Sequence, residues 1–178
     1  MQLFLVKPDL MHYEAYLNMM DEWRSSGTQI APWFLGIEIT DEEDFARFVR
    51  MLDNCSHGIL DPQYAATTSY FVMDERARLI GAGSLRHYLT PEGLRTWGHI
   101  GYGIRPSERR KGYAVQTLQL LLQQAAAMKI PKALIGVHEG NVGSWKTVER
   151  CGGMLENTVL VPGEEEPIRR YWINTKDS

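Results

Sequence analysis

Four basic residues lie within a seven-residue stretch directly before a predicted helix. They are Arg105, Arg109, Arg110 and Lys111. The stretch contains one acidic residue, Glu108, and Gly112 follows it. A helix N-terminus offers unpaired N–H groups and a partial positive charge, and a glycine lets an anion approach the backbone closely. These residues therefore predict an oxyanion site, with phosphate as its natural ligand.

Charge alone also allows a basic loop that merely ends a solvated turn, but Gly112 and the small Ala114 favour the anion site. Two common phosphate motifs do not fit this stretch. The P-loop string GxxxxGK[ST] is absent from the sequence. Gly101-Tyr102-Gly103 begins a dinucleotide-like GxG, but Arg105 and Pro106 stand where its helix would begin, and its third glycine is missing.

Hydrophobic periodicity predicts the elements that must position this loop. The predicted helices cover residues 10–23, 40–52, 112–130 and 141–150, and Thr40 with Glu43 forms a capping box. The predicted strands cover residues 2–6, 67–74, 78–88, 95–105 and 133–137, followed by two strands within 154–174. Several glycines indicate that the strand over 95–105 is bulged or distorted. The connection over 28–39 is so apolar that we expect it to cover another part of the protein.

The order of these elements predicts the fold class. Residues 67–105 contain three successive strands with short turns, which favours antiparallel pairing. A long helix precedes the apolar strand over 133–137, which favours a parallel crossover. We expect one α/β (α+β) domain over residues 1–178, with a mixed, mostly antiparallel seven-stranded sheet and about four helices.

Composition excludes several classes of protein. Hydrophobic residues make up 44% and charged residues 23% of the 178 residues, as in ordinary globular chains, so disorder is not expected. A net charge of -3 argues against nucleic-acid binding, and no apolar run is long enough to span a membrane. Two cysteines without CxxC spacing fit reduced thiols, and five scattered histidines predict no metal site. We expect a soluble, cytoplasmic protein.

The segment GHIGYGIRPSERRKGYA, residues 98–114, resembles the fourth strand and pyrophosphate loop of the GNAT superfamily of acetyl-CoA-dependent N-acetyltransferases. The family signature R/Q-x-x-G-x-G/A is met by Arg109, Gly112 and Ala114. A six-residue signature is weak evidence alone, so the rest of the chain has to agree with it.

A second segment, NVGSWKTVERCGG at residues 141–153, resembles the family segment that follows the fifth strand. Asn141 and Ser144 stand at its recurring polar positions. The predicted order of elements from residue 2 to residue 174 is similar to that of the family. The resemblance thus covers nearly the whole chain and implies a GNAT-like fold.

The resemblance implies that acetyl-CoA is the co-substrate and lies where the fourth and fifth strands separate. Its pantetheine arm would pair with backbone near residues 102–104, and backbone groups of residues 109–114 would hold its pyrophosphate. The implied cofactor-binding residues are Ile104, Arg109, Arg110, Lys111, Gly112, Tyr113, Ala114, Asn141 and Ser144. From its position before a helix, Asn141 is equally suited to cap that helix.

Acetyl transfer to an amine requires a neutral amine, although a lysine-like amine has a pKa of about 10.4. His138, beside Glu139 at the exit of the fifth strand, is the candidate base, and removal of the proton through water is the alternative. Tyr102 is the second candidate catalytic residue. Strand alternation directs His99 and Tyr102 to opposite faces, so one of them belongs to the core.

The sequence departs from the family at Val148, where many members carry a tyrosine that protonates the leaving thiolate. A thiol with a pKa of about 8.5 leaves without full protonation, and Tyr102 or Tyr113 is available as a substitute. The oxyanion would then rest on a backbone N–H of the separated strand. Cys151 has no predicted histidine partner, so we expect direct transfer in a ternary complex rather than an acetyl-enzyme.

The acceptor is expected to be a primary amine of a small molecule or peptide. Its pocket has candidate walls in Trp33, Phe34 and Trp97, and residues 164–166 are acidic and would attract a cation; core packing and a solvated turn are the alternatives. A catalytically silent acetyl-CoA sensor is the competing function, because of Val148, and transfer of another acyl group is a third hypothesis. The aromatic strand near the C-terminus leaves a homodimer possible.

Overall fold

The computed structural model describes residues 2–59 and 63–175. Within them the strands form two sheets, and every ladder in both sheets is antiparallel. The larger sheet has the order β1 (Leu3–Val6), β2 (Thr67–Asp74), β3 (Leu79–Arg86), β4 (Ile100–Ile104). The smaller sheet has the order β5 (Lys132–His138), β7 (Ile168–Asn174), β6 (Met154–Val159). The expected α/β class with mostly antiparallel strands is confirmed, with the seven strands divided four and three.

The described residues contain five α-helices, one more than the sequence predicts. They are α1 (Tyr13–Ser25), α2 (Glu42–Ser56), α3 (Pro91–Arg95), α4 (Tyr113–Ala127) and α5 (Val142–Arg150). The additional helix α3 occupies the expected turn, because Thr90 caps it by accepting from Gly93 N at 3.1 Å. The expected cap of α2 is wrong by one residue: Asp41 is the N-cap, and Thr40 N donates to Asp44 Oδ2 at 3.1 Å.

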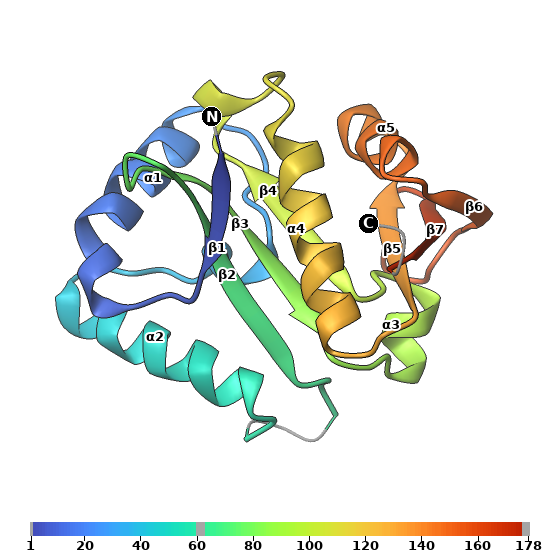
Figure 1. Cartoon of the computed structure of the whole chain (residues 1–178), viewed down its shortest axis with the longest axis horizontal. Helices are drawn as coiled ribbons and strands as arrows, with labels where there is room; N and C mark the ends of the chain where they lie inside the picture. Colours follow the sequence, from blue (N-terminus) through green and yellow to red (C-terminus); the bar gives the residue numbers. More distant parts are fainter. Residues whose placement is uncertain (1, 60–62, 176–178) are drawn as a thin grey trace.

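The larger sheet is covered on both faces (Figure 1). Phe71 packs into a core with α1 and α2, whereas its neighbour Val72 packs with residues of α4. Successive strand residues point to opposite faces, so α1 and α2 cover one face and α4 covers the other. A third cluster joins α4 to β5 and β7 and thereby attaches the smaller sheet.

The strands β4 and β5 meet at one end and separate at the other. At the joined end His99 N donates to Leu134 O at 2.7 Å and Gly136 N donates to Trp97 O at 3.1 Å, around an isolated antiparallel bridge. Beyond this link the two strands form no ladder within the described residues. The parallel crossover pairing that the sequence favours is therefore not formed, and a gap opens beside β4.

Glycines in β4 let the apolar connection lie directly on the strand. The strand is shorter than predicted and begins at Ile100. A Cβ on Gly103 would overlap the carbonyl oxygen of Ala31 and lie 2.9 Å from the Trp23 ring. A Cβ on Gly101 would lie 3.5 Å from Pro32. The glycines therefore reflect close packing of the connection rather than a bulge. The expectation that the connection covers another part of the protein is confirmed, and the structure shows that this part is β4.

We predict that Gly103→Ala destabilises the protein by about 2–3 kcal/mol, because the new methyl group has no room between β4 and residue 31. Gly36→Ala is the matched control, since its Cβ would meet nothing within 4 Å. Denaturant unfolding of both variants measures the difference. Equal free energies of unfolding for the two variants would show that the connection over residues 28–39 shifts to accommodate the methyl group without destabilising the protein.

Candidate functional site

A cavity of about 280 Å³ lies at the gap between β4 and β5. Its walls come from the connection over residues 29–33, from β3, β4 and β5, and from the start of α5. Its lining includes Trp33, Arg86, Trp97, Tyr102, His138, Asn141 and Ser144. Segments that are far apart in the sequence thus meet at one concave site, which is the usual form of a small-molecule pocket.

The edge of β4 that faces this gap carries unpaired backbone groups. Arg105 N donates to Ile80 O at 2.9 Å, so alternation in the β3–β4 ladder directs Gly101 and Gly103 toward β3. The N–H and C=O groups of Tyr102 therefore point toward the gap, and no described residue pairs with them. An extended ligand can add to this edge as a strand would.

The loop before α4 presents further unpaired N–H groups. Arg110 and Gly112 adopt left-handed backbone conformations, with φ of 63° and 84°. Gln116 N donates to Gly112 O, but in the described part of the chain no acceptor is found for the amides of Lys111, Gly112, Ala114 and Val115. Alternating left- and right-handed residues that turn several amides outward form an anion-binding nest. The predicted oxyanion site therefore has a suitable backbone.

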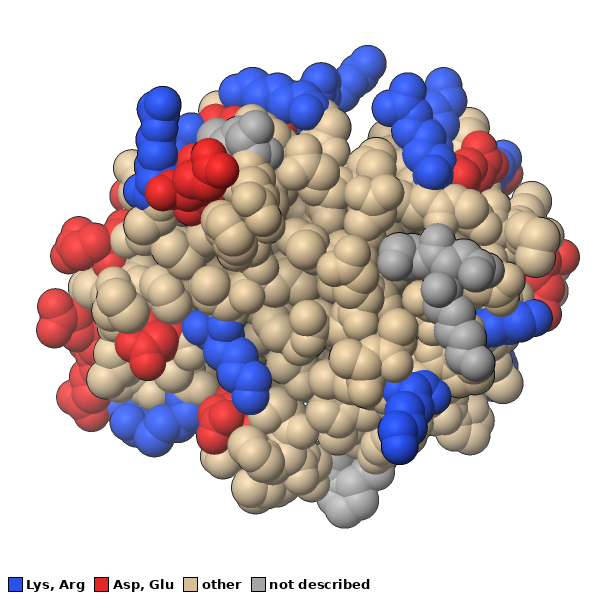
Figure 2. Space-filling model, viewed as in Figure 1, with Lys and Arg blue, Asp and Glu red and all other residues tan. Residues whose placement is uncertain are grey.

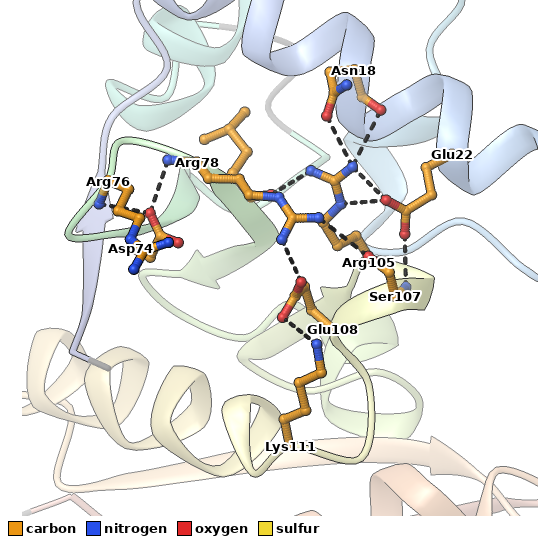
Figure 3. Close-up of polar contacts among 10 residues, drawn as sticks. Asn18, Glu22, Asp74, Arg76, Arg78, Arg105, Ser107, Glu108 and Lys111 are labelled. Carbon is orange, nitrogen blue, oxygen red and sulfur yellow. Dashed lines mark hydrogen bonds and ion pairs between the residues drawn. The ribbon is translucent and has the colours of Figure 1, made fainter.

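The side-chain cations of this stretch contribute less than the sequence suggests. Arg105 is 2% exposed and is held by Glu22, with Nε 2.8 Å from Oε2, and by the carbonyl oxygen of Leu79 at 3.0 Å (Figure 3). Glu22 also accepts from Ser107 N at 2.7 Å. The prediction that Arg105 belongs to the anion site is wrong, since its charge is neutralised inside the protein.

Glu108 is a second internal anion that fixes the loop. It is 5% exposed, forms an ion pair with Arg78, and accepts from Lys111 Nζ at 3.0 Å (Figure 3). Burial alone would raise the pKa of Glu108, but hydrogen bonds from Lys111 and Arg78 outweigh it and lower that pKa. The Lys111 charge is thus balanced, although its side chain stays half exposed.

Arg109 turns back toward the body of the protein. Its Nε donates to Ile104 O and its guanidinium donates to Thr28 Oγ1, both at 3.0 Å. It also lies 5.6 Å from the centre of the Trp23 ring. Arg110 remains exposed. In Figure 2, basic side chains stand along the upper edge, over the loop before α4 and beside α5, whereas acidic side chains gather over α1 and α2.

The polar residues of α5 meet Tyr102 across the gap. Asn141 caps the helix by accepting from Ser144 N at 3.1 Å, as the alternative reading of the sequence expects, and it also lines the cavity. The Tyr102 hydroxyl lies 3.2 Å from Ser144 Oγ. Burial raises the pKa of Tyr102 to about 12, so its hydroxyl stays protonated at neutral pH.

His138 lines the cavity and contacts two side chains from other segments. Its Nε2 lies 3.1 Å from Glu164 Oε2, and its ring packs edge-on against Trp97 at 5.0 Å between centres. Its sequence neighbour Glu139 instead pairs with Arg169 at 3.1 Å. Spacing in the sequence gives no sign that Glu164 is the partner of His138, because β7 and its preceding loop bring them together.

His99 is the core member of the pair that strand alternation separates. Its Nδ1 accepts from Leu134 N at 3.0 Å, so it helps to join β4 to β5. Burial, aided by the nearby Arg86 charge, lowers the pKa of His99 to about 4 and keeps the ring neutral. His99 is thus a structural residue.

Of the aromatic residues predicted to line the pocket, two line the cavity and one lies in the core. Trp33 and Trp97 line the cavity, and Trp33 is 48% exposed. Phe34 is fully buried against α1 and α2, so its predicted place in the pocket is wrong. Of the three acidic residues at 164–166, Glu164 contacts His138, and Glu166 accepts from Gly140 N at 3.0 Å.

The surroundings of Val148 and Cys151 do not suit either residue for the reaction. Val148, at the position of the family tyrosine, is fully buried in the core between α4 and β5. Burial raises the pKa of the Cys151 thiol to about 11, and that thiol lies 3.8 Å from Val115 O. A thiol with so high a pKa is protonated at neutral pH and is a weak nucleophile. Cys55 and Cys151 are both free, as expected.

The family model described as “Acetyltransferase (GNAT) domain” matches residues 2–154. The chain belongs to the GNAT acetyltransferase family. No curated protein sequence matches this GNAT protein. In the described residues no helix is long and apolar enough to cross a membrane, and no group of three or more metal-binding side chains occurs.

Solved structures share the fold of this GNAT protein at low sequence identity. RimL, a ribosomal L7/L12 α-N-protein acetyltransferase, in complex with coenzyme A has a TM-score of 0.70 at 18% identity, over 97% of this chain and 93% of that chain. The Microcin C7 self-immunity acetyltransferase MccE, in complex with acetyl-CoA and AMP, has a TM-score of 0.67 at 18% identity, over 97% and 92%. The spermidine/spermine N-acetyltransferase SpeG from Vibrio cholerae has a TM-score of 0.64 at 16% identity, over 99% and 95%.

We predict that Glu22→Gln lowers the free energy of unfolding by about 3 kcal/mol at pH 7, because it leaves the buried Arg105 without a counter-charge. Burial would raise the pKa of Glu22, but hydrogen bonds from Arg105 and Ser107 lower it from 4.5 to about 2. A depressed carboxyl pKa stabilises the fold above pH 4.5, and that stabilisation is lost as the pH falls toward 2.

Urea unfolding of wild type and Glu22→Gln across this pH range measures the effect. Glu14→Gln, on the exposed side of the same helix, is the control and should follow the wild-type curve. Parallel wild-type and Glu22→Gln curves between pH 4.5 and pH 2 would mean that the Glu22 carboxylate does not stabilise the fold.

Proposed function

We propose that this protein transfers an acetyl group from acetyl-CoA to a primary amine, by direct attack within a ternary complex. One observation carries the proposal: unpaired N–H groups occur at Tyr102, which lines the cavity between β4 and β5, and again at Lys111 and Gly112 in the nest at the start of α4. This arrangement suits a long ligand with an anionic middle and a reactive end. The structures of MccE with acetyl-CoA and RimL with coenzyme A support the same ligand.

The amides of Lys111, Gly112, Ala114 and Val115 would hold the pyrophosphate, together with Tyr113 at the helix start. The exposed side chain of Arg110 adds charge there, and Arg109 would act by holding the loop against Ile104. The pantetheine arm would pair with the carbonyl oxygen of Tyr102 and the N–H of Ile104 on the gap-facing edge of β4, while Asn141 and Ser144 border its other side.

His138 would remove the proton from the acceptor amine. The amine must lose this proton before its lone pair attacks the thioester carbonyl carbon. When Nε2 of His138 donates to Glu164, its Nδ1 is left as the acceptor, and Glu164 stabilises the imidazolium that forms. Trp97 fixes the plane of the ring.

Tyr102 would serve the reaction through two groups. Its backbone N–H, which faces the gap, can donate to the oxyanion of the tetrahedral intermediate. Its hydroxyl, beside Ser144 and protonated at neutral pH, can donate a hydrogen bond to the departing thiolate, which leaves without full protonation because its thiol has a pKa of about 8.5. A tyrosine from β4 would thus stabilise the leaving group in place of the tyrosine that many family members carry at the position of Val148.

Direct transfer is favoured over a covalent acetyl-enzyme because Cys151 is a protonated thiol outside the residues that line the cavity. A catalytically silent acetyl-CoA sensor is the competing function, and the buried Val148 is the observation that favours it. Release of CoA thiol with any member of an amine panel separates the two. Tight acetyl-CoA binding without turnover would favour the sensor.

We predict that Gly112→Glu lowers acetyl-CoA affinity at least about 100-fold, because it brings a carboxylate to the amides that would hold the pyrophosphate. Gly58→Glu is the control, since it adds the same side chain at a similar positive φ of 68° near the end of α2. Calorimetry with acetyl-CoA measures both variants. Equal affinities for Gly112→Glu and wild type would place the pyrophosphate elsewhere.

We predict that His138→Gln reduces kcat by about 100-fold, the usual contribution of a positioned base, while acetyl-CoA affinity changes little. Glu164→Gln should reduce kcat less, because the base itself remains. His57→Gln, at the exposed end of α2, is the control. Steady-state kinetics with the best amine of the panel test this. A His138→Gln enzyme with the kcat of wild type would assign proton removal to water.

A further inference from the structure

Arg86 lies at the end of β3 and lines the cavity between β4 and β5. Its NH1 donates to Gly98 O at 3.0 Å, and this is the one hydrogen bond that its guanidinium makes to a described residue. Its other guanidinium nitrogens have no partner among the described residues, and they are not fully buried. They are therefore accessible, and part of this cation is available to a ligand in the cavity.

Arg86 also lacks a counter-ion, since no described carboxylate forms an ion pair with it. The buried Arg105 pairs with Glu22 and the half-buried Arg169 pairs with Glu139, whereas the half-buried Arg109 resembles Arg86 in having no ion pair but makes more contacts within the protein. Burial lowers the pKa of Arg86, and no acidic neighbour raises it. A guanidinium nevertheless stays protonated at neutral pH, so a partly desolvated positive charge is left unbalanced.

The described lining of the cavity contains no Asp or Glu, and Arg86 is the side chain there that is charged at every physiological pH. Glu164 contacts His138 from outside the residues that line the cavity, at the place proposed for the amine. Ser84, two residues earlier on the same face of β3, also lines the cavity; its hydroxyl is buried and has no partner among the described residues. The Ser84 hydroxyl is enclosed, so Arg86 is the polar group of this strand face that a ligand in the cavity can reach.

The remaining walls are apolar or aromatic. Trp33 and Trp97 lie in the lining together with Ile100 and Pro32. Trp97 is also the residue against which His138 packs, so the aromatic wall reaches from the base toward Arg86 and its partner Gly98. A ligand that fills this space needs an apolar body and an anionic group.

We propose that the acceptor is a primary amine that also carries an anionic group, a carboxylate or a phosphate, which Arg86 binds while the amine lies at His138. This inference rests on the proposed function and adds the substrate class to it. The planar guanidinium fork matches the oxygen pairs of carboxylates and phosphates. A polyamine such as the substrate of SpeG would instead bring further positive charge to an uncompensated cation.

Matched acceptors test the proposal with the full-length protein and acetyl-CoA. L-tryptophan, L-tryptophanamide and tryptamine share one aromatic body, and only the first carries a carboxylate. Phosphoethanolamine and ethanolamine form the corresponding pair for phosphate, and spermidine is the polycationic probe. We expect kcat/KM, measured by release of CoA thiol, to be about 10–100-fold higher for the anionic member of at least one pair.

Arg86→Gln and Arg86→Lys separate recognition from structure. Arg86→Gln should bring the ratio of kcat/KM for the anionic acceptor over its uncharged counterpart close to one, and Arg86→Lys should restore part of that ratio. A purely structural arginine would change kcat/KM for both members of a pair alike and leave the ratio unmoved. Thermal unfolding of both variants checks that the contact with Gly98 is not needed for folding.

The outcomes distinguish this inference from the proposed function. Preference for tryptamine or spermidine would overturn the anionic acceptor and leave acetyl transfer to an amine intact. An unchanged ratio in Arg86→Gln would overturn the role of Arg86. Tight acetyl-CoA binding with no thiol release from any probe would overturn both proposals.

Discussion

Unpaired backbone N–H groups occur in two places, at Tyr102 on the gap-facing edge of β4 and at the start of α4, on either side of residues 105–109, whose N–H groups are paired within the protein. The link of His99 to Leu134 joins β4 and β5 at one end, and beyond it no described strand pairs with that edge. Two internal anions, Glu22 and Glu108, fix the loop that follows (Figure 3). Because main-chain donors strongly favour acceptors, a ligand with oxygen atoms along its length is the expected occupant.

Periodicity and turn chemistry are local properties, and they predicted most of the fold. The apolar face of α4 and its glycine start were correct, as were the β2–β3 hairpin and the buried strand β5. The cations and Gly112 also indicated the loop before α4, where the amides of Lys111 and Gly112 have no acceptor among the described residues. The ion pairs of this loop were not predicted, since Glu22 lies 83 residues before Arg105 and Arg78 lies 30 before Glu108. Without a structure, charges that are neutralised inside the protein resemble charges that await a ligand.

Residues of the candidate site could be predicted where a titratable side chain stands alone on a strand. They could not be predicted where their role depends on a contact between segments that are far apart in the sequence. His138 and Tyr102 were found as lone titratable residues on strands that the family resemblance places at the gap. The acidic run at 164–166 was noted in the sequence, but nothing local pairs Glu164 with His138, because the loop between β6 and β7 brings them together. Arg86 carries no local signal, since it ends β3 as an ordinary charged residue. The glycines of β4 indicated distortion, but they make room for residues 31 and 32.

An amide-resolved NMR titration with coenzyme A tests the central claim most directly, because it reports on individual N–H groups. The amides of Lys111, Gly112, Ala114 and Val115 should show the largest shifts, followed by that of Tyr102 on the free edge of β4. The amide of Gly58, at the far end of α2, should not move. Binding of coenzyme A that leaves the loop amides unmoved, with shifts confined to another surface, would contradict the assignment of this loop as the pyrophosphate site.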